Sequence, residues 1–274
     1  MTNAPFVYSR TIPFRPPSAE EIKRWKDTAS DYALATVAAS HWLPPVEQTL
    51  AELARIGVHV ERLLGCSDIV QARSVVATTL LDLNKHKAVF WLDADTQLHP
   101  VDVLRLLEKS VTPQPRRFAG LHPLPYDLEL APGALVTAVC PSRGRHQLLP
   151  VWGDSVTSVT LGAPGPLIPI QAAGMGCVAH PLELLADMAD SCKRVRQGWR
   201  PFFMPAVLNG YYLAEDFAFY ALAGEYGWPA YADPEPRVIH WGDYPYHWED
   251  ALNAWGPRNL ADVVSVELTR ESSP

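Results

Sequence analysis

Residues 88–100, AVFWLDADTQLHP, decide the fold because they join a short apolar run to two carboxylates. Ala88–Leu92 has the length and composition of a buried strand, in which side chains alternate between the two faces of a sheet. Asp93 and Asp95 are two residues apart, so we expect them to point the same way at the carboxyl end of that strand. Neighbouring carboxylates repel each other unless a cation, a proton or a basic side chain neutralises them. The stretch therefore predicts a binding site at a strand end.

Strand-like and helix-like segments alternate around this run. The predicted order is strand 32–40, helix 44–56, strand 58–64, helix 69–84, strand 88–92, helix 101–110 and strand 117–121. Gly57 fits a helix C-cap, Ser67 or Asp68 fits an N-cap, and Pro100 fits a first helical turn with His99 as its N-cap. Such alternation is typical of an α/β fold, in which a mainly parallel sheet is flanked by helices and binds ligands at the carboxyl ends of its strands.

Beyond about residue 122 the pattern becomes irregular. Strands are expected at 133–139 and 155–161, which could pair as a hairpin, and 162–169 contains too many glycines and prolines for a regular element. Helices are expected at 181–195 and 215–226. We predict an N-terminal arm (1–31), a single domain (32–255) with an irregular C-terminal portion, and a C-terminal tail (256–274).

Composition excludes several classes of protein. The chain has 23 basic and 30 acidic residues and a net charge of −7, which disfavours a broad surface for nucleic-acid phosphates. Hydrophobic residues make up 48% of it but never run long enough to span a bilayer, and the N-terminus does not resemble a secretory signal, so we expect a cytoplasmic protein. The cysteines lack the spacing of a zinc site and are expected to be reduced and packed: Cys66, Cys140, Cys177 and Cys192.

Four short motifs carry the candidate chemistry, and each also has an ordinary structural explanation. The motifs are Asp93-Ala94-Asp95, Gly174-Met175-Gly176, Glu215-Asp216 and His240. The aspartates could cap the following helix or balance arginines, and the glycines could form a turn. Acidic residues are favoured in a first helical turn by the helix dipole, and a lone histidine after an apolar run is often a core residue. No single motif therefore decides the function.

The order of the four motifs resembles that of the GT-A glycosyltransferases, which are nucleotide-sugar-dependent enzymes built on one Rossmann-like sheet. The resemblance covers about residues 32–242. It implies that Asp93 and Asp95 hold Mn²⁺ or Mg²⁺ against the diphosphate of the donor, with Asp95 as the more direct ligand. It also implies that Gly174 and Gly176 line the donor sugar and the acceptor, and that His240 completes the metal site.

The same resemblance extends to the catalytic base and to the nucleotide. It implies that the base of an inverting transfer lies in Glu215-Asp216, with Asp216 preferred, and that the segment with Asp68 and Arg73 contacts the nucleotide. Arg73 could supply a fixed cation to a diphosphate. It could equally form a structural ion pair with Asp68 or Asp93.

The resemblance therefore implies a metal-dependent glycosyltransferase that moves a sugar from a nucleotide-diphosphate sugar to an acceptor hydroxyl with inversion, and it leaves the acceptor open. The expected partners are a nucleotide-diphosphate sugar and an acceptor, which is a small molecule, a glycan, a protein or a modified DNA base. The loop with Arg143, Arg145 and His146 could contact the phosphate of a phosphate-bearing acceptor such as DNA. Two other classes stay open. The first is a phosphohydrolase of the haloacid dehalogenase kind, which also has an Asp-x-Asp after a strand, although that motif usually lies nearer the N-terminus. The second is a non-catalytic sugar-nucleotide binding protein, which would need no catalytic base.

Overall fold

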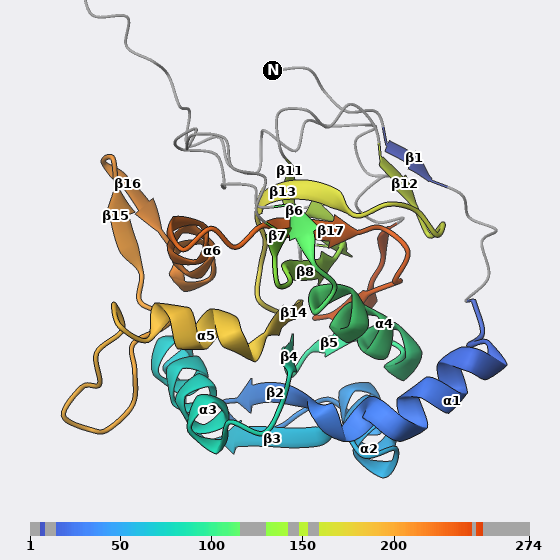
Figure 1. The fold of residues 1–274 in the computed structure, drawn as a ribbon, viewed down its shortest axis with the longest axis horizontal. Coiled ribbons are helices and arrows are strands. Elements are labelled where there is room, and N and C mark those ends of the chain that lie inside the picture. Colours follow the sequence, from blue (N-terminus) through green and yellow to red (C-terminus); the bar gives the residue numbers. More distant parts are fainter. Residues whose placement is uncertain are drawn as a thin grey trace, which may run out of the picture.

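The structure of the chain is a computed structural model that describes residues 6–8, 15–115, 130–141, 148–152, 159–242 and 245–248. Its centre is an eight-stranded mixed sheet (Figure 1). In spatial order the strands are β11 (Val151–Trp152), β13 (Ile168–Ala172), β17 (Ala230–Asp233), β8 (Leu135–Ala138), β14 (Cys177–Pro181), β4 (Ala88–Leu92), β2 (Tyr32–Ala38) and β3 (His59–Leu64).

Six strands of the sheet run in one direction, because β11 is antiparallel to β13 and so runs with β17. β2 is parallel to both β3 and β4, and β17 is parallel to β8. β14 is antiparallel to both β4 and β8, so it separates the two parallel groups without reversing their direction. β13 is antiparallel to β17. The fold is therefore an α/β fold with a Rossmann-like, mainly parallel sheet, as expected for the GT-A type, and the carboxyl ends of β4 and β2 share one edge.

Helices cover both faces of the sheet (Figure 1). They are α1 (Ala19–Thr28), α2 (Pro44–Arg55), α3 (Ile69–Leu83), α4 (Pro100–Ser110), α5 (Leu182–Met188) and α6 (Glu215–Glu225), with a 3-10 turn at Ala29–Asp31. Because strand side chains alternate, Ala33 and Ala35 of β2 pack in a core with α3, α5 and α6, whereas Leu34 packs in a second core with α1, α2 and α4. Each face of the sheet thus has its own apolar layer.

Smaller strand pairs surround the sheet. They are β1 (Phe6–Tyr8) with β12 (Val159–Leu161), β6 (Gln114–Pro115) with β7 (Leu130–Ala131), β9 (Cys140–Pro141) with β10 (Leu148–Leu149), β15 (Ala206–Leu208) with β16 (Tyr211–Leu213), and β5 (Thr96–Gln97) with β18 (Ile239–Trp241), which also pairs with β19 (Pro245–Tyr246). Within the described ranges, no helix has both the length and the apolar character that a membrane span requires.

Most local predictions for residues 32–110 are confirmed. The side chain of Asp68 caps α3 by accepting from the backbone N–H groups of Val70 and Gln71 at 3.0 and 3.2 Å. The side chain of His99 caps α4. Gly57 follows α2 with a φ of +106°, which glycine adopts readily.

Predictions for the second half were less accurate. The strands expected at 133–139 and 155–161 do not pair as a hairpin, because β8 lies between β14 and β17 while β12 pairs with β1. The helix expected at 181–195 ends at Met188, and strand β14 precedes it. The strand expected at 117–121 lies outside the described residues.

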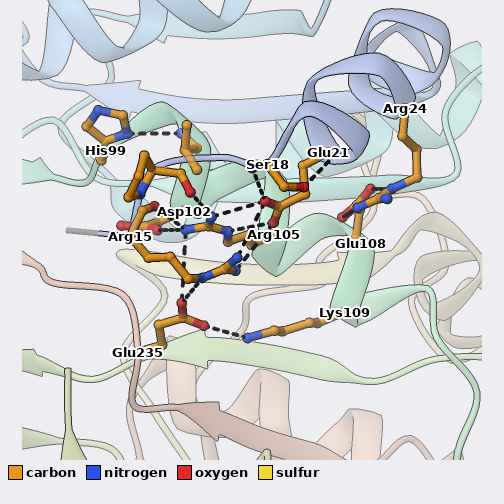
Figure 2. A network of polar contacts seen from close by, with 12 residues as sticks. Arg15, Ser18, Glu21, Arg24, His99, Asp102, Arg105, Glu108, Lys109 and Glu235 are labelled. Carbon is orange, nitrogen blue, oxygen red and sulfur yellow. Dashed lines mark hydrogen bonds and ion pairs between the residues drawn. The ribbon is translucent and has the colours of Figure 1, made fainter. Parts of the chain in front are cut away.

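A buried network of charges attaches the N-terminal segment to the domain (Figure 2). Arg105 of α4 has a side chain that is only 3% exposed, and its Nε donates to Glu21 of α1 at 3.0 Å. Its Nη1 donates to Asp102 at 3.3 Å and to the carbonyl of Arg15 at 3.0 Å. The same nitrogen lies 4.0 Å from Glu235, which follows β17 in the sequence. The segment expected as an arm therefore contains a helix that is held by one buried guanidinium.

The ion pairs of Arg105 should contribute strongly to stability. We expect Arg105→Met to lower the free energy of unfolding by about 3–5 kcal/mol, because it removes the ion pair of the buried Asp102 and one of the two arginines that pair with Glu21. The control is Arg24→Met, since Arg24 pairs with Glu108 but is 48% exposed, and its loss should cost at most about 1 kcal/mol. Urea denaturation of both variants measures the difference, and equal losses would contradict this account of the network.

Candidate functional site

The two aspartates that follow β4 have separate partners. β4 ends at Leu92, and a turn follows in which the Thr96 N–H donates to the Asp93 carbonyl at 3.2 Å. Strand alternation therefore stops before the aspartates, and each carboxylate has its own ion-pair partner. Asp93 contacts an arginine of α3, whereas Asp95 contacts a histidine of β18.

Asp93 belongs to an ion-pair bridge with α3 and α6. The Nη2 of Arg73 donates to Asp93 Oδ1 at 2.7 Å, and its Nη1 donates to Glu215 Oε1 at 3.0 Å. Arg73 is almost fully buried, with a side chain 5% exposed, whereas Asp93 is 33% exposed. One guanidinium thus joins residues that are 142 positions apart in sequence. The alternative in which Arg73 pairs structurally with Asp93 is the one that the structure contains.

Gly176 lies directly against Asp93. Its carbonyl accepts from the Asp93 N–H at 3.2 Å. A Cβ on Gly176 would lie 2.9 Å from Asp93 Oδ2, which is closer than real Cβ atoms approach, and 3.4 Å from the hydroxyl of Thr96. Glycine is therefore needed here because the backbone approaches the carboxylate, and not because of its φ angle. Gly174 lies half-buried in the same connection between β13 and β14.

Asp95, in the turn before β5, faces His240 of β18. The Nε2 of His240 lies 3.6 Å from Asp95 Oδ1, and the Trp241 N–H donates to the Asp95 carbonyl at 2.7 Å. The Nδ1 of His240 lies 2.9 Å from the Pro141 carbonyl. Burial lowers the pKa of His240, but Asp95, Cys140 and the Pro141 carbonyl together raise it to about 10. His240 is therefore held beside the aspartates rather than in a separate core.

Asp216 lies near the Arg73 bridge without a direct part in it. Its Oδ1 accepts from the Phe217 N–H at 2.8 Å, at the start of α6. Burial raises the pKa of Asp216 first, Glu215 and Asp93 add to that effect, and the Phe217 N–H and Arg73 oppose it, which leaves the pKa at about 6. The structure therefore brings the two acidic motifs into electrostatic contact.

Asp68 acts as the predicted helix cap, and Cys140 has a contact that the sequence did not predict. Asp68 is exposed and caps α3, so its observed contacts are those of a helix cap. Cys140, expected to be simply packed, has its Sγ 4.0 Å from His240 Nδ1. The Cys177 thiol lowers the pKa of Cys140, and His240 acts in the same direction. No short motif around Cys140 indicates this contact, because β9 and β18 meet only in the folded chain. Arg143, Arg145 and His146 lie outside the described residues.

The donor set of Asp95 and His240 suits a divalent cation. A carboxylate oxygen and a neutral imidazole nitrogen are both ligands for Mn²⁺, so the cation would have to displace the proton that the raised pKa of His240 keeps on the ring. Carboxylates together with substrate phosphates hold Mg²⁺. Across the described part of the chain, no three His, Cys, Asp or Glu side chains gather closely enough to hold a metal ion. Asp93, expected as a third ligand, instead accepts from Arg73. The residues present therefore fit a site in which Asp95 and His240 supply the protein ligands.

Comparisons with known proteins show the fold but no family. No protein-family model matches the chain, and no curated protein matches it. The crystal structure of A197 from STIV is similar at a TM-score of 0.52 with 11% identity, over 80% of this chain and 91% of that one. A structure of GalNAc-T7 with UDP, GalNAc and Mn²⁺ is similar at a TM-score of 0.41 with 12% identity, over 91% of this chain and 57% of that one. The likeness to A197 shows the fold alone, and that to GalNAc-T7 is too low to carry an argument.

The close approach of Gly176 to Asp93 gives a test of the site's packing. We expect Gly176→Ala to lower the free energy of unfolding by about 1–3 kcal/mol, because the new methyl group displaces Asp93 from Arg73. Gly165→Ala is the control, since a Cβ there meets only the Ala163 carbonyl at 3.9 Å. Urea denaturation compares the two variants. If Gly176→Ala is as stable as Gly165→Ala, the described packing of Asp93 is incorrect.

Proposed function

We propose that the protein is a metal-dependent glycosyltransferase that moves a sugar from a nucleotide-diphosphate sugar to an acceptor hydroxyl with inversion. One observation carries the proposal: side chains from four distant segments meet at the carboxyl end of β4. Arg73 bridges Asp93 and Glu215, Gly176 lies against Asp93, and His240 of β18 pairs with Asp95 in the turn that follows β4. These are the segments that the resemblance to GT-A enzymes selects, and the ends of parallel strands are where such sheets bind ligands.

The Asp95–His240 pair is the proposed holder of the metal and the donor diphosphate. When bound there, Mn²⁺ or Mg²⁺ stabilises the negative charge that grows on the leaving diphosphate. Asp95 is 29% exposed and His240 18%, so both side chains reach the surface where a donor can approach. Gly174 and Gly176 lie in the connection that enters β14, beside Asp93, and are the proposed lining of the donor-sugar side of the site.

Asp216 is the proposed general base. Glycosyl transfer passes through an oxocarbenium-like state, and the acceptor hydroxyl must lose its proton as it attacks the anomeric carbon. A base is most effective when its pKa lies near the working pH, and the pKa of Asp216 is raised to about 6. In an inverting transfer the attacking hydroxyl and the leaving diphosphate lie on opposite sides of the sugar, so the base need not contact the metal ligands.

A phosphohydrolase of the haloacid dehalogenase kind is less well supported. Such an enzyme would use Asp93 as a nucleophile. Asp93 Oδ1 accepts from a buried guanidinium at 2.7 Å, and its Oδ2 faces the backbone of Gly176. An ion pair stabilises the carboxylate and lowers its nucleophilicity. Release of inorganic phosphate from simple monoesters, without transfer of any sugar, would favour this alternative.

The metal assignment predicts the behaviour of Asp95→Asn. A thermal-shift screen of nucleoside diphosphates with and without Mn²⁺ first identifies the nucleotide, because a ligand of the native state raises its stability. Asp95→Asn should abolish the Mn²⁺-dependent part of that stabilisation, since it removes a ligand charge at constant size. Asp82→Asn is the control, because Asp82 is 49% exposed and pairs with Arg194. Unchanged Mn²⁺ dependence in Asp95→Asn would exclude Asp95 as a ligand.

The base assignment predicts a loss of transfer without a loss of binding. Asp216→Asn should bind the nucleoside diphosphate normally and lower the rate of sugar transfer by about a hundredfold or more, within the range for losing acid–base catalysis. Wild-type kcat/KM should rise with pH through the pKa of Asp216, about 6, because only the carboxylate accepts a proton. Donor turnover and nucleotide affinity measure the two effects. Normal transfer by Asp216→Asn would remove Asp216 from the mechanism.

A further inference from the structure

Arg73 is surrounded by more negative charge than it can pair with. Its guanidinium contacts Asp93 and Glu215 at 2.7 and 3.0 Å, and Asp216 lies close enough to interact with it electrostatically. The Nε of Arg73 is buried and has no hydrogen-bond partner among the described residues. A buried arginine with two fixed carboxylate partners acts as a rigid charge between α3, β4 and α6.

This arrangement treats Glu215 and Asp216 differently although they are adjacent. Glu215 Oε1 accepts from Arg73, whereas the hydrogen bond of Asp216 comes from the backbone N–H of Phe217. The Arg73 contact therefore fixes Glu215 Oε1 in an ion pair with a buried guanidinium. Asp216 is the carboxylate whose negative charge is not neutralised by a direct ion pair with Arg73.

We infer that Arg73 is a positioning residue, which holds Glu215 in an ion pair with β4 and thereby reserves Asp216 for proton transfer. The inference rests on the proposed function and divides the roles of the acidic residues within it. It replaces the expectation that Arg73 contacts the donor diphosphate, because both of its terminal nitrogens have carboxylate partners in the protein. It also assigns Glu215 to the support of the site and not to the chemistry.

The charges that face Asp216 come from three elements. Glu215 precedes it on α6, Arg73 lies on α3, and Asp93 follows β4. Tyr220, one turn later on α6, stays protonated because burial raises its pKa, so it adds no charge. Removing the negative charge of Glu215 should therefore lower the pKa of Asp216, and removing the positive charge of Arg73 should raise it.

The test is a carboxyl ¹³C NMR titration of Asp216 in the full chain, with its signal assigned by its loss in Asp216→Asn. Glu215→Gln should shift the pKa of Asp216 downward and Arg73→Met upward, each by about 1 unit, as expected for charges within a few ångströms. Arg194→Met, which removes an exposed arginine, is the control and should not shift it. If Arg73→Met does not fold, the pKa of Asp216 in Glu215→Gln decides the test alone. Arg73→Lys, which keeps the positive charge, then serves as the variant at position 73.

The pH profile of transfer adds a readout that a purely structural role would not move. The acidic limb of kcat/KM should shift in the same direction as the NMR pKa in each variant. An unshifted or upward-shifted pKa of Asp216 in Glu215→Gln would overturn the inference. If the NMR shifts occur but no donor is turned over by the wild type, the charge arrangement stands and the proposed function fails, so the two failures are distinguishable.

Discussion

The ion-pair bridge of Arg73 is the constraint on which the rest of the site depends. A guanidinium with a side chain 5% exposed costs several kcal/mol to bury unless carboxylates compensate for the lost water. Asp93 and Glu215 provide that compensation, and in doing so they tie the end of β4 to the starts of α3 and α6. Asp93 then lies close to the chain that enters β14, where a Cβ at position 176 would lie 2.9 Å from Asp93 Oδ2. The positions of four segments thus follow from the neutralisation of one buried charge.

Local signals explain why residues 32–110 were predicted well. The caps at Asp68 and His99, the proline at position 100 and the apolar run of β4 act over a few residues, and each has a direct physical effect on the backbone. The segment 177–181 carries no such signal. It is a buried five-residue run that includes His180, between a glycine turn and a helix, and it pairs with β4 on one side and β8 on the other. α1 was likewise not predicted, although Ser18 and Glu21 form a capping box there.

The candidate site shows the same division between local and long-range information. The residue types and their order were sufficient to select Asp93, Asp95, Glu215, Asp216 and His240. They were not sufficient to predict the partner of Asp93, because a carboxylate at a strand end is neutralised equally well by a metal or by an arginine from another helix. The structure uses an arginine at Asp93 and a histidine at Asp95, so the two carboxylates are neutralised separately. The contact between Cys140 and His240 depends on the pairing of distant strands and has no sequence signal.

The central claim is that Asp95 and His240 hold the metal that binds the donor diphosphate, while Arg73 keeps Asp93 and Glu215 in place. Anomalous diffraction at the manganese absorption edge tests it most directly, in crystals of the protein grown with Mn²⁺ and the nucleoside diphosphate that stabilises it best. The account predicts one strong peak within coordination distance of Asp95 Oδ1 and His240 Nε2, with the Arg73 bridge intact. A manganese peak at Asp93 and Glu215, the carboxylates that pair with Arg73, would contradict it. Mn²⁺ bound away from Asp95 while the nucleotide occupies the site would also contradict it.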